Sequence, residues 1–398
     1  MRILFVHKSF PAQFIRLAPY LAAQPGVAVL ALGDVAFLHS RRAWFDATGV
    51  LGIGYEFSED DRLADAEVFE RRARAVERAA RELGARGLRP DLIIAHASWG
   101  EAVYLKQVFD RARLVVYCEW FYNAPTMSDE DIDLAVLHDA QTRQEHNSRI
   151  IAALEAADAG WAPTQWQRAQ FPPSYHGKIA VIHDGVDTDL ITPGGKRDGE
   201  PLVTFATRSL VPTRGFHIFM RALPEIQRRR PEARIVIAGS DAVAYGNARQ
   251  DGESYRAALL RELNGRLDLS RITFAGMLPY DQYVDLLRRS AVHVYGSFPF
   301  VLSWSFIDAL AAGCLVVGSR TAPVEEVLRD GDNGLLYEYG SPADLAARVD
   351  EALGRSDADE IRTRARRTAV ERYDWKGVCL PAQLRLIQDV LASHRTPP

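Results

Sequence analysis

Two arginines bracket a short loop in the second half of the chain. The loop lies in the segment TRSLVPTRGF, where Arg208 and Arg214 follow the apolar stretch Leu202–Thr207, which predicts a strand. Ligands of parallel α/β sheets bind beyond the carboxyl ends of the strands. Two guanidinium groups at such a place can clamp a diphosphate and stabilise the negative charge that develops on it as it leaves. The alternative is a pair of arginines that only face solvent.

A second loop with ligand-binding character lies in YGSFPFVLSWSFIDALAAGCLVV, residues 295–317. An apolar strand at Ala291–Tyr295 leads into this loop, a helix begins near Ser303 or Ser305, and the helix ends at Gly313. Serine is a common N-cap residue, and glycine commonly follows the last turn of a helix. We therefore expect the loop amides and the start of the helix to lie where a parallel sheet binds anions.

A carboxylate lies inside the first turns of that predicted helix. Asp308 can accept hydrogen bonds from the two hydroxyl groups of a ribose. The alternative is an aspartate whose carboxylate is only solvated, and the residue alone does not decide between the two.

The surrounding pattern predicts an α/β protein with two parallel sheets. Short apolar runs alternate with amphipathic segments twice over, which is typical of parallel strands connected by helices. The segment PGGKRDG at Pro193–Gly199 is the clearest break in composition and predicts a linker between the two halves. We expect strands at 2–6, 27–32, 92–95, 114–118, 157–163, 178–183, 202–207, 234–238, 272–274 and 291–295, and helices at 14–21, 69–83, 131–154, 165–170, 216–229, 255–263 and 280–288.

Length, charge and cysteine content narrow the class of protein. A chain of 398 residues is expected to form two domains rather than one core. A formal net charge of -4 gives no indication of nucleic-acid binding, which usually accompanies a basic balance. The three cysteines are far apart in the sequence, as expected of thiols in a reducing compartment. No apolar run is long enough for a signal sequence or a membrane span, so we expect a cytoplasmic protein.

One predicted helix allows two interpretations. Apolar residues at 69, 73, 76, 80 and 83 line one face of the segment 69–83, and the other face carries arginines and glutamates together. Mixed charges favour a face that is only solvated. The alternative is a helix that lies on a membrane surface, which would make any membrane association peripheral.

Several catalytic motifs are absent from the sequence. No G-x-G-x-x-G follows the first strand of either half, and no G-x-x-x-x-G-K-[ST] occurs, which argues against a nicotinamide dehydrogenase or a P-loop enzyme. The cysteines and histidines do not have the spacing of a zinc site, and there is no G-x-S-x-G elbow. The sequence therefore predicts no metal site.

An ordered set of motifs makes the second half recognisable. TRSLVPTRG is followed by IVIAG, ITFAGMLPYDQ, FIDALAAGCLVV and DGDNGLL, and VIHDGVDTD precedes them. Together these segments resemble the nucleotide-binding domain of retaining glycosyltransferases of family 4, also called glycosyl transferases group 1. The resemblance covers the second half and reaches back to about Ala157, and it is weaker over roughly the first 150 residues.

The resemblance implies a GT-B fold, in which two facing Rossmann-like domains enclose an interdomain cleft. Residues 1–192 would form the acceptor domain, completed by a helix at about Lys376–Ser393 within 376–398, and residues 200–372 would form the nucleotide-sugar donor domain. The loop after the first strand, often Gly-Gly in this family, begins here with Ser9 and Phe10. That loop would have to offer its amides to the donor without the conformational freedom of glycine.

The family signature is a glutamate, seven residues and a second glutamate. Here the second glutamate aligns with Asp308, a shorter carboxylate that can still bind the ribose, and the first aligns with Phe300, which cannot accept a hydrogen bond from a sugar hydroxyl. The backbone remains, and the amides of Phe300, Val301, Leu302 and Ser303 can still face a diphosphate or a sugar.

Many relatives place a histidine after the fourth strand of the first domain, near the reacting sugar. The corresponding place holds Glu119, which makes it the first candidate for a polar group at the reaction centre, and His96 is the second. Either residue alternatively only satisfies loop amides. Trp99, Trp120 and the neighbouring aromatic residues either stack on a sugar acceptor or pack between domains.

The resemblance also implies a mechanism. In such enzymes the leaving diphosphate takes the acceptor proton, so no protein nucleophile is needed. Arg208 and Arg214 would replace a divalent cation, and Arg214 stands where the family usually has lysine, which changes a point charge into a planar fork. No resident cofactor is expected, because the nucleotide sugar is a co-substrate.

We therefore expect transfer of a hexose-type sugar from a UDP or GDP donor to a hydroxyl of a glycan, a lipid-linked sugar or a small molecule. Because Phe300 replaces a glutamate, one alternative is a sugar-nucleotide-binding protein with little catalysis. Another is a sugar-nucleotide epimerase with the same fold. The sequence does not indicate the sugar, the acceptor or the oligomeric state.

Overall fold

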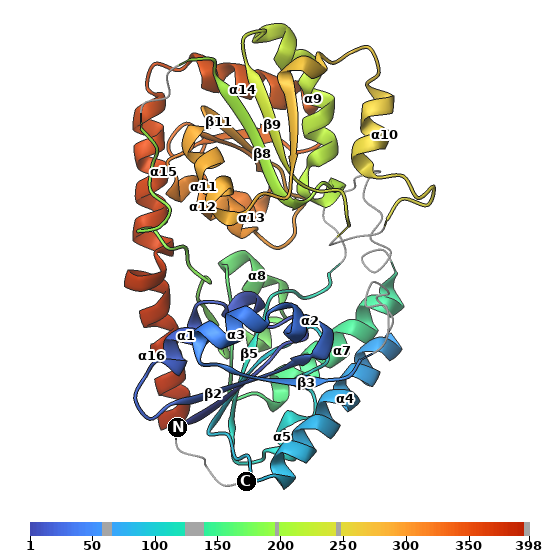
Figure 1. The fold of residues 1–398 in the computed structure, drawn as a ribbon, viewed down its shortest axis with the longest axis vertical. Coiled ribbons are helices and arrows are strands. Elements are labelled where there is room, and N and C mark those ends of the chain that lie inside the picture. Colours follow the sequence, from blue (N-terminus) through green and yellow to red (C-terminus); the bar gives the residue numbers. More distant parts are fainter. Residues whose placement is uncertain (58–65, 124–138, 196–198, 244–247, 394–398) are drawn as a thin grey trace. The chain divides into compact units, whose positions relative to one another are not determined.

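Two parallel sheets organise the residues that the computed structural model describes, which are 1–57, 66–123, 139–195, 199–243 and 248–393 (Figure 1). Each sheet belongs to its own compact unit. Unit 1 contains the described residues up to 184 together with 379–393, and unit 2 contains those from 185 to 378. The division lies between Asp184 and Gly185, upstream of the linker expected at 193–199.

The sheet of unit 1 has the strand order β3-β2-β1-β4-β5-β6-β7, and every neighbouring pair is parallel. The order reverses between β1 and β4, so the chain leaves these two neighbouring strands toward opposite sides of the sheet. The strands are β1 (Arg2–Val6), β2 (Ala28–Asp34), β3 (Leu51–Tyr55), β4 (Leu92–His96), β5 (Arg113–Tyr117), β6 (Ala159–Ala162) and β7 (Ile179–Val181).

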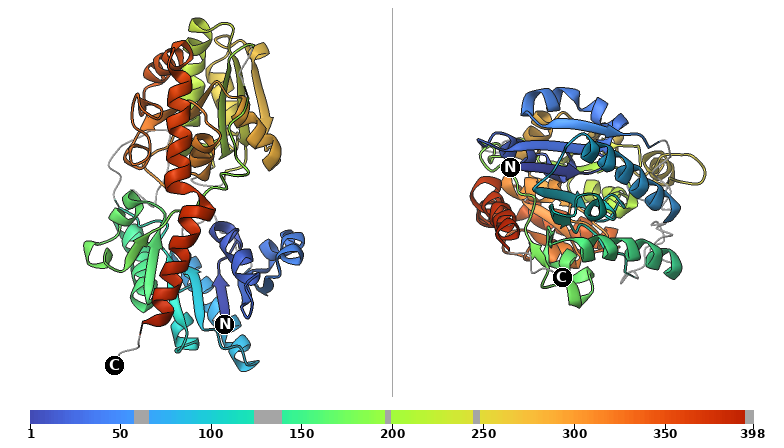
Figure 2. Two further views of the ribbon diagram at one scale, coloured as in Figure 1. Left: turned by 90° about the vertical axis from the view of Figure 1, so that its left-hand side faces the viewer. Right: turned by 90° about the horizontal axis from the view of Figure 1, so that it is seen from below.

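Helices cover both faces of this sheet. On one face, alternate residues of the central strands, such as Leu4 and Ile93, pack against buried residues of α4, α5 and α7. On the other face, Phe5 packs against Phe14 with ring centres 5.1 Å apart, and α16 lies against β5 (Figure 2). The helices are α1 (Leu17–Ala22), α2 (Val35–Ser40), α3 (Arg42–Thr48), α4 (Ala66–Ala85), α5 (Leu105–Val108), α7 (Ala140–Ala156), α8 (Gln165–Gln170) and α16 (Leu380–Ala392), with 3-10 turns η1 (Ala12–Phe14) and η2 (Pro173–Tyr175).

Unit 2 repeats the arrangement with the strand order β10-β9-β8-β11-β12-β13, again parallel throughout. Here the order reverses between β8 and β11. The strands are β8 (Leu202–Ser209), β9 (Arg234–Ser240), β10 (Ile272–Gly276), β11 (Val292–Tyr295), β12 (Val316–Arg320) and β13 (Leu335–Glu338).

Two apolar clusters flank the sheet of unit 2. Phe205 and Ile237 face the buried sides of α9 and α14, whereas Val316 and Leu336 face α12 and α15. The helices are α9 (Phe216–Arg229), α10 (Tyr255–Glu262), α11 (Tyr280–Arg289), α12 (Trp304–Ala311), α13 (Ala322–Glu325), α14 (Pro342–Gly354) and α15 (Ala358–Tyr373), with 3-10 turns η3 (Pro212–Arg214) and η4 (Leu269–Arg271) and a π-helical turn η5 (Trp375–Cys379).

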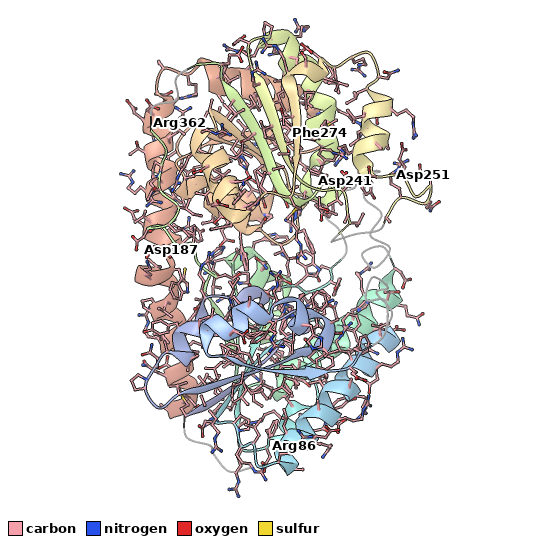
Figure 3. All side chains as sticks on the ribbon, in the orientation of Figure 1. Arg86, Asp187, Asp241, Asp251, Phe274 and Arg362 are labelled. Carbon is pink, nitrogen blue, oxygen red and sulfur yellow. The ribbon has the colours of Figure 1, made fainter. Side chains whose placement is uncertain are left out.

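Charged residues fix α10 beside two strands of unit 2. Arg256 on α10 pairs with Asp241, directly after β9, at 2.5 Å. Its guanidinium carbon also lies 5.3 Å from the ring centre of Phe274 on β10. Asp241 and Phe274 are labelled in Figure 3. These two contacts of Arg256 anchor α10 at the edge of the sheet.

The predicted fold class is confirmed, because both halves are parallel α/β sheets of Rossmann type. The predicted helix at 216–229 coincides with α9, and α12 starts after Ser303, whose side chain accepts a hydrogen bond from the Ser305 amide as an N-cap. The expected helix at 131–154 is present as α7 from Ala140, and residues 131–138 lie outside the described ones. The elements that were not predicted are strands β3 and β13 and helices α2, α3, α5, α13, α14 and α15.

The segment that enters unit 2 is bound to the end of α15. The Val186 amide donates to the Tyr373 carbonyl and the Trp375 amide donates to the Val186 carbonyl, both at 2.8 Å. The predicted final helix at 376–393 is observed as the π-helical turn followed by α16.

None of the helices in the described part of the chain combines the length and the apolar character that a bilayer crossing requires.

Two glycines bring the loops after β8 and β11 into contact. Gly215 has φ +72°, and a Cβ added there would lie 2.7 Å from the Cα of Gly296. A Cβ added at Gly296 would in turn lie 2.9 Å from the Cα of Gly215. The backbones can approach this closely only because neither residue has a side chain.

We expect Gly215→Ala to lower the free energy of unfolding by about 2 to 4 kcal/mol, the sum of a left-handed backbone cost and an overpacking cost. Gly252→Ala is the matched control, because Gly252 has φ +73° and nothing within 4 Å of an added Cβ. It should lose only about 1 kcal/mol. Urea unfolding measures both, and equal losses would contradict the role of the contact.

Candidate active site

The loops after β8 and β11 form the first part of the candidate site. The strands are hydrogen-bonded neighbours, so their carboxyl ends open onto the same place, where the strand order reverses. The Phe298 amide donates to the Thr213 carbonyl at 3.1 Å, which joins the two loops next to the contact between the glycines. Such a reversal point is where open α/β sheets bind ligands.

Arg214 is held at this point by the neighbouring loop. Its side chain is largely buried, and Nη1 donates to the Val301 carbonyl at 2.8 Å. The guanidinium carbon lies 5.8 Å from the ring centre of Phe300. The planar fork therefore has a fixed orientation, in contrast to Arg208, which is exposed near the end of β8.

The loop from Gly296 to Ser303 is fixed by hydroxyl groups from two strands. The Ser297 amide donates to Ser319 Oγ at 3.1 Å, and the Ser303 amide donates to Tyr295 Oη at 2.9 Å. Between these anchors, the amides of Val301 and Leu302 donate to no acceptor among the described residues. They lie directly before α12, where backbone amides suit an anion.

Asp308 lies one turn into α12 and is buried. The hydroxyl of Tyr283 on α11 donates to Asp308 Oδ2 at 3.3 Å. Burial, and then the Asp308 carboxylate, raise the pKa of Tyr283 well above its ordinary value, so the phenol stays protonated and remains a donor. Asp308 is thus held by a neighbouring helix.

Two histidines occupy equivalent places where the strand order of unit 1 reverses. His7 follows β1 and His96 ends β4, and both are buried. In each case Nδ1 accepts the amide of the residue two positions later, Ser9 or Ser98, at 3.1 Å. The rings meet edge to face with centres 5.2 Å apart. Both Nδ1 atoms therefore act as acceptors, which leaves the proton on Nε2.

Glu119 follows β5 and lies between two donors. Its Oε2 is 3.2 Å from His96 Nε2, and its Oε1 accepts from Gln13 Nε2 at 2.8 Å. The Glu119 side chain is 15% exposed, whereas that of His96 is fully buried. Glu119 is thus a partly accessible carboxylate that two neighbours hold in place.

Lys8 has an unusual environment beside these residues. Its ammonium lies 4.0 Å from the ring centre of Trp99, whose ring is stacked on His96 with centres 5.5 Å apart. Burial, and then the nearby Arg72, lower the pKa of Lys8 to about 8 against the attraction of Glu101. Proton release from Lys8 therefore moves close to physiological pH.

Behind Lys8 lies a buried carboxylate. Glu101 accepts a hydrogen bond from the Tyr55 hydroxyl at 2.6 Å, and burial raises its pKa. Arg72 on α4 is also buried, and its guanidinium carbon lies 4.6 Å from the ring centre of Phe57. The Tyr55–Glu101 pair ties the end of β3 to the loop after β4.

Both halves of the chain match models of known protein families. Residues 34–191 match the family model for the Glycosyl transferase family 4 group, and residues 200–355 match that for Glycosyl transferases group 1. The chain belongs to the family 4, group 1 glycosyltransferases. This confirms the predicted resemblance, and the first match also covers much of the half in which the sequence motifs were weak.

Relatives with curated names cover part of the chain. A phosphatidyl-myo-inositol mannosyltransferase of Mycobacterium tuberculosis is 31% identical over 231 residues, 54% of this chain and 55% of the relative. A D-inositol 3-phosphate glycosyltransferase of Acidothermus cellulolyticus is 30% identical over 235 residues, 55% of this chain and 50% of the relative. The chain thus spans about half the length of these relatives.

Solved structures of glycosyltransferases share the fold over the whole chain. HepE from Anabaena, in complex with UDP and glucose, has a TM-score of 0.74 at 18% identity, covering 98% of this chain and 100% of HepE. A glycosyltransferase from Rickettsia africae has a TM-score of 0.73 at 16% identity, with 99% of each chain covered. At these identities the similarity establishes the GT-B fold.

The loop that the family often builds from two glycines adopts a different arrangement in this chain. The Ser9 amide donates to His7 Nδ1, and the Phe10 amide donates to the His7 carbonyl at 3.1 Å. The Phe10 ring is fully buried and stacks on Phe45, with ring centres 5.8 Å apart. Both amides that were expected to face a donor are therefore used within the loop.

The predicted site residues gather at two sheet edges. Ser9, Phe10, His96 and Glu119 lie at the carboxyl edge of unit 1. The corresponding edge of unit 2 holds Arg208, Arg214, Phe300, Val301, Leu302 and Ser303, with Asp308 one turn into α12.

Sequence reasoning missed four residues of the unit 1 edge. His7 and Lys8 directly follow β1, so the strand pattern could have indicated them. Gln13 and Glu101 carry no local signal, because their partners Glu119 and Tyr55 are distant in the sequence.

The shifted pKa of Lys8 gives a pH dependence of stability. Between about pH 8 and pH 10.5 the unfolded chain keeps a proton that folded Lys8 has released. The free energy of unfolding of the wild type should therefore rise with pH over this range by up to about 3 kcal/mol.

Lys8→Met removes this titration. Urea unfolding at several pH values should show the stability difference between Lys8→Met and the wild type shifting in favour of the wild type as the pH rises. Lys106→Met is the control, because it removes a lysine of the same unit whose ammonium lies near Asp158. A difference that stays constant for Lys8→Met from pH 7 to pH 10 would contradict the assignment.

Proposed function

We propose that this protein is a retaining glycosyltransferase that moves a hexose-type sugar from a nucleoside diphosphate donor to a hydroxyl group. The observation that carries the proposal is the position of Arg214. Its buried guanidinium is fixed on the Val301 carbonyl beside the Val301 and Leu302 amides, where the strand order of unit 2 reverses. A fixed planar cation next to amides at a helix start suits a diphosphate.

The donor-binding role of unit 2 has further support. HepE, which shares the fold, has been solved with UDP and with UDP-glucose. Asp308, held by Tyr283, would accept hydrogen bonds from the ribose hydroxyls. Arg208, exposed near the end of β8, would add a second positive charge to the diphosphate. Either UDP or GDP fits this set of contacts.

The acceptor would supply its hydroxyl to the residues of unit 1. Both relatives named above act, by their names, on inositol-containing molecules, one of them a phospholipid. Glu119 is a partly accessible carboxylate beside His96 at this edge, and it would accept a hydrogen bond from the acceptor. A polyhydroxylated group, alone or linked to a lipid, is the proposed acceptor.

The proposed transfer proceeds with retention, as the resemblance to retaining glycosyltransferases implies. The bond between the anomeric carbon and the diphosphate oxygen breaks, and the acceptor oxygen bonds to the same face of the sugar. The proton of the acceptor hydroxyl passes to the leaving diphosphate. In this proposal Arg208 and Arg214 stabilise the charge of the leaving group, so no divalent cation is required.

Phe300 favours one other function. The ring stands where the family has a glutamate, so this loop offers the donor sugar no carboxylate. A protein that binds sugar nucleotides and turns them over poorly would have this property. Nucleotide binding without turnover on a broad acceptor panel would support that second function.

We expect a thermal-shift screen to detect a nucleoside diphosphate ligand. A ligand at 100 times its dissociation constant adds about 2.7 kcal/mol to the free energy of unfolding. UDP, GDP and their sugar conjugates should stabilise the protein, and nucleosides without phosphate should not.

Release of the diphosphate from the selected donor should continue in EDTA. Activity that EDTA abolishes and magnesium restores would contradict the metal-free part of the proposal.

Replacing the fixed arginine should slow transfer. We expect Arg214→Ala to lower kcat/KM for the donor by about 100- to 1,000-fold, the cost of one stabilising donor to a developing anion. Arg214→Lys should recover part of the loss, because charge remains without the planar fork. Arg234→Ala is the matched control, since Arg234 begins β9 at the opposite end of the sheet and pairs with Glu200. Similar rates in wild type and Arg214→Ala would overturn the assignment.

A further inference from the structure

Glu119 belongs to a hydrogen-bonded group of side chains in which His96 is fully buried, while Gln13 and Glu119 remain partly exposed. Each of its oxygens has a donor, Gln13 Nε2 on Oε1 and His96 Nε2 on Oε2, at 2.8 and 3.2 Å. The donors come from two separate segments, the turn η1 after β1 and the end of β4. Two donors on separate oxygens fix both the position and the rotation of a carboxylate.

A second histidine lies near Gln13. His7 accepts the Ser9 amide on Nδ1, so its proton lies on Nε2. Burial first, then His96, Lys8 and Arg72, lower the pKa of His7 well below its ordinary value, against a smaller opposite effect of the nearby Gln13 side chain, so His7 is neutral. His7 Nε2 and Gln13 Oε1 are both buried, and neither has a hydrogen-bond partner of normal geometry in the described part of the chain. Gln13 is therefore held by its contact with Glu119 rather than by His7.

The backbone before Gln13 has an uncommon conformation. Ala12 has φ +40°, and it is the one residue other than glycine with positive φ in the described part of the chain. Side chains disfavour this region, so it persists where the surroundings enforce it. Here Ala12 is the first residue of η1, the turn that carries the Gln13 side chain to Glu119, 106 residues away in the sequence.

The charges around this chain of side chains leave Glu119 as the group presented at the edge. Lys8 lies on Trp99, and Arg72 and Glu101 are almost completely buried. Lys8 is near Arg72, Glu101, Asp34 and Glu119, so the cations of the edge already have carboxylates beside them. Glu119 keeps 15% exposure, and its oxygens still have lone pairs for a further donor.

We propose that Gln13 is a positioning residue, and that with His96 it holds Glu119 to accept a hydrogen bond from a hydroxyl group of the sugar acceptor. The inference rests on the proposed function and adds to it the residue that orients the Glu119 carboxylate toward the acceptor. Gln13 acts on the acceptor only through Glu119.

A double-mutant cycle tests this dependence. The donor selected by the thermal-shift screen is used with myo-inositol and methyl α-D-glucopyranoside as acceptor probes, and donor hydrolysis is measured without acceptor. Gln13→Leu should lower kcat/KM for the acceptor about 10- to 100-fold and leave donor hydrolysis unchanged. In the Glu119→Ala background, Gln13→Leu should have no further effect. Full additivity of the two changes would overturn the proposal.

Two further measurements, of nucleotide binding and of histidine tautomers, make the result of the double-mutant cycle interpretable. Gln13→Leu should keep the wild-type thermal shift with nucleotide, since that site lies in unit 2, and Gln107→Leu on α5 is a control for loss of a glutamine in unit 1. In ¹⁵N NMR of the full chain, His7 and His96 should both carry the proton on Nε2. A proton on Nδ1 of His96 would overturn the positioning arrangement, because Nε2 could then not donate to Glu119.

The NMR measurement needs no acceptor. If the wild type binds nucleotide but transfers to neither probe and does not hydrolyse the donor, the proposed transferase function fails. The tautomer of His96 then decides by itself whether the arrangement around Glu119 exists.

Discussion

The parallel pairing of two strands at a reversal of strand order determines where chemistry can occur in each unit. In unit 1 the pair is β1 and β4, and in unit 2 it is β8 and β11. Because successive connections leave such a pair toward opposite sides, the loops beyond its carboxyl end are not covered by a crossover. The positions of the polar residues result from this arrangement. His7 follows β1 and His96 ends β4, whereas Arg214 and the start of α12 follow β8 and β11.

The two units fix these loops by different physical means. In unit 2 the contact is between backbones, because Gly215 and Gly296 have no side chains to keep them apart. The first loop of unit 1 contains no glycine, so its amides turn inward onto His7 and side chains make the connections instead. A backbone contact leaves amides near the helix start for a ligand, whereas side-chain contacts leave a carboxylate, Glu119. The difference in loop sequence thus becomes a difference in what each edge can bind.

Local patterns predicted the parts of the fold that depend on local chemistry. Helix α9 and the N-cap at Ser303 follow from periodicity and capping. Strand β3 was missed because its sequence LGIGY alternates with glycines, over which Phe45 and Val35 pack. The pairing of Gln13 with Glu119 could not be predicted, since it depends on tertiary contact across 106 residues. The family resemblance placed Glu119 at the site but gave no information about what holds it.

The exchange of a carboxylate for an aromatic ring at position 300 affects the arginine beside it. The Phe300 ring centre lies 5.8 Å from the Arg214 guanidinium carbon. A carboxylate at a similar distance would offset much of the guanidinium charge toward an approaching anion, since two opposite charges attract strongly in a partly buried site. A ring attracts the cation through its quadrupole and leaves the net charge in place. In the proposed donor complex, the absence of a carboxylate at position 300 therefore leaves a stronger positive field for the diphosphate. We expect this loop to bind the donor more through phosphate than through sugar hydroxyls.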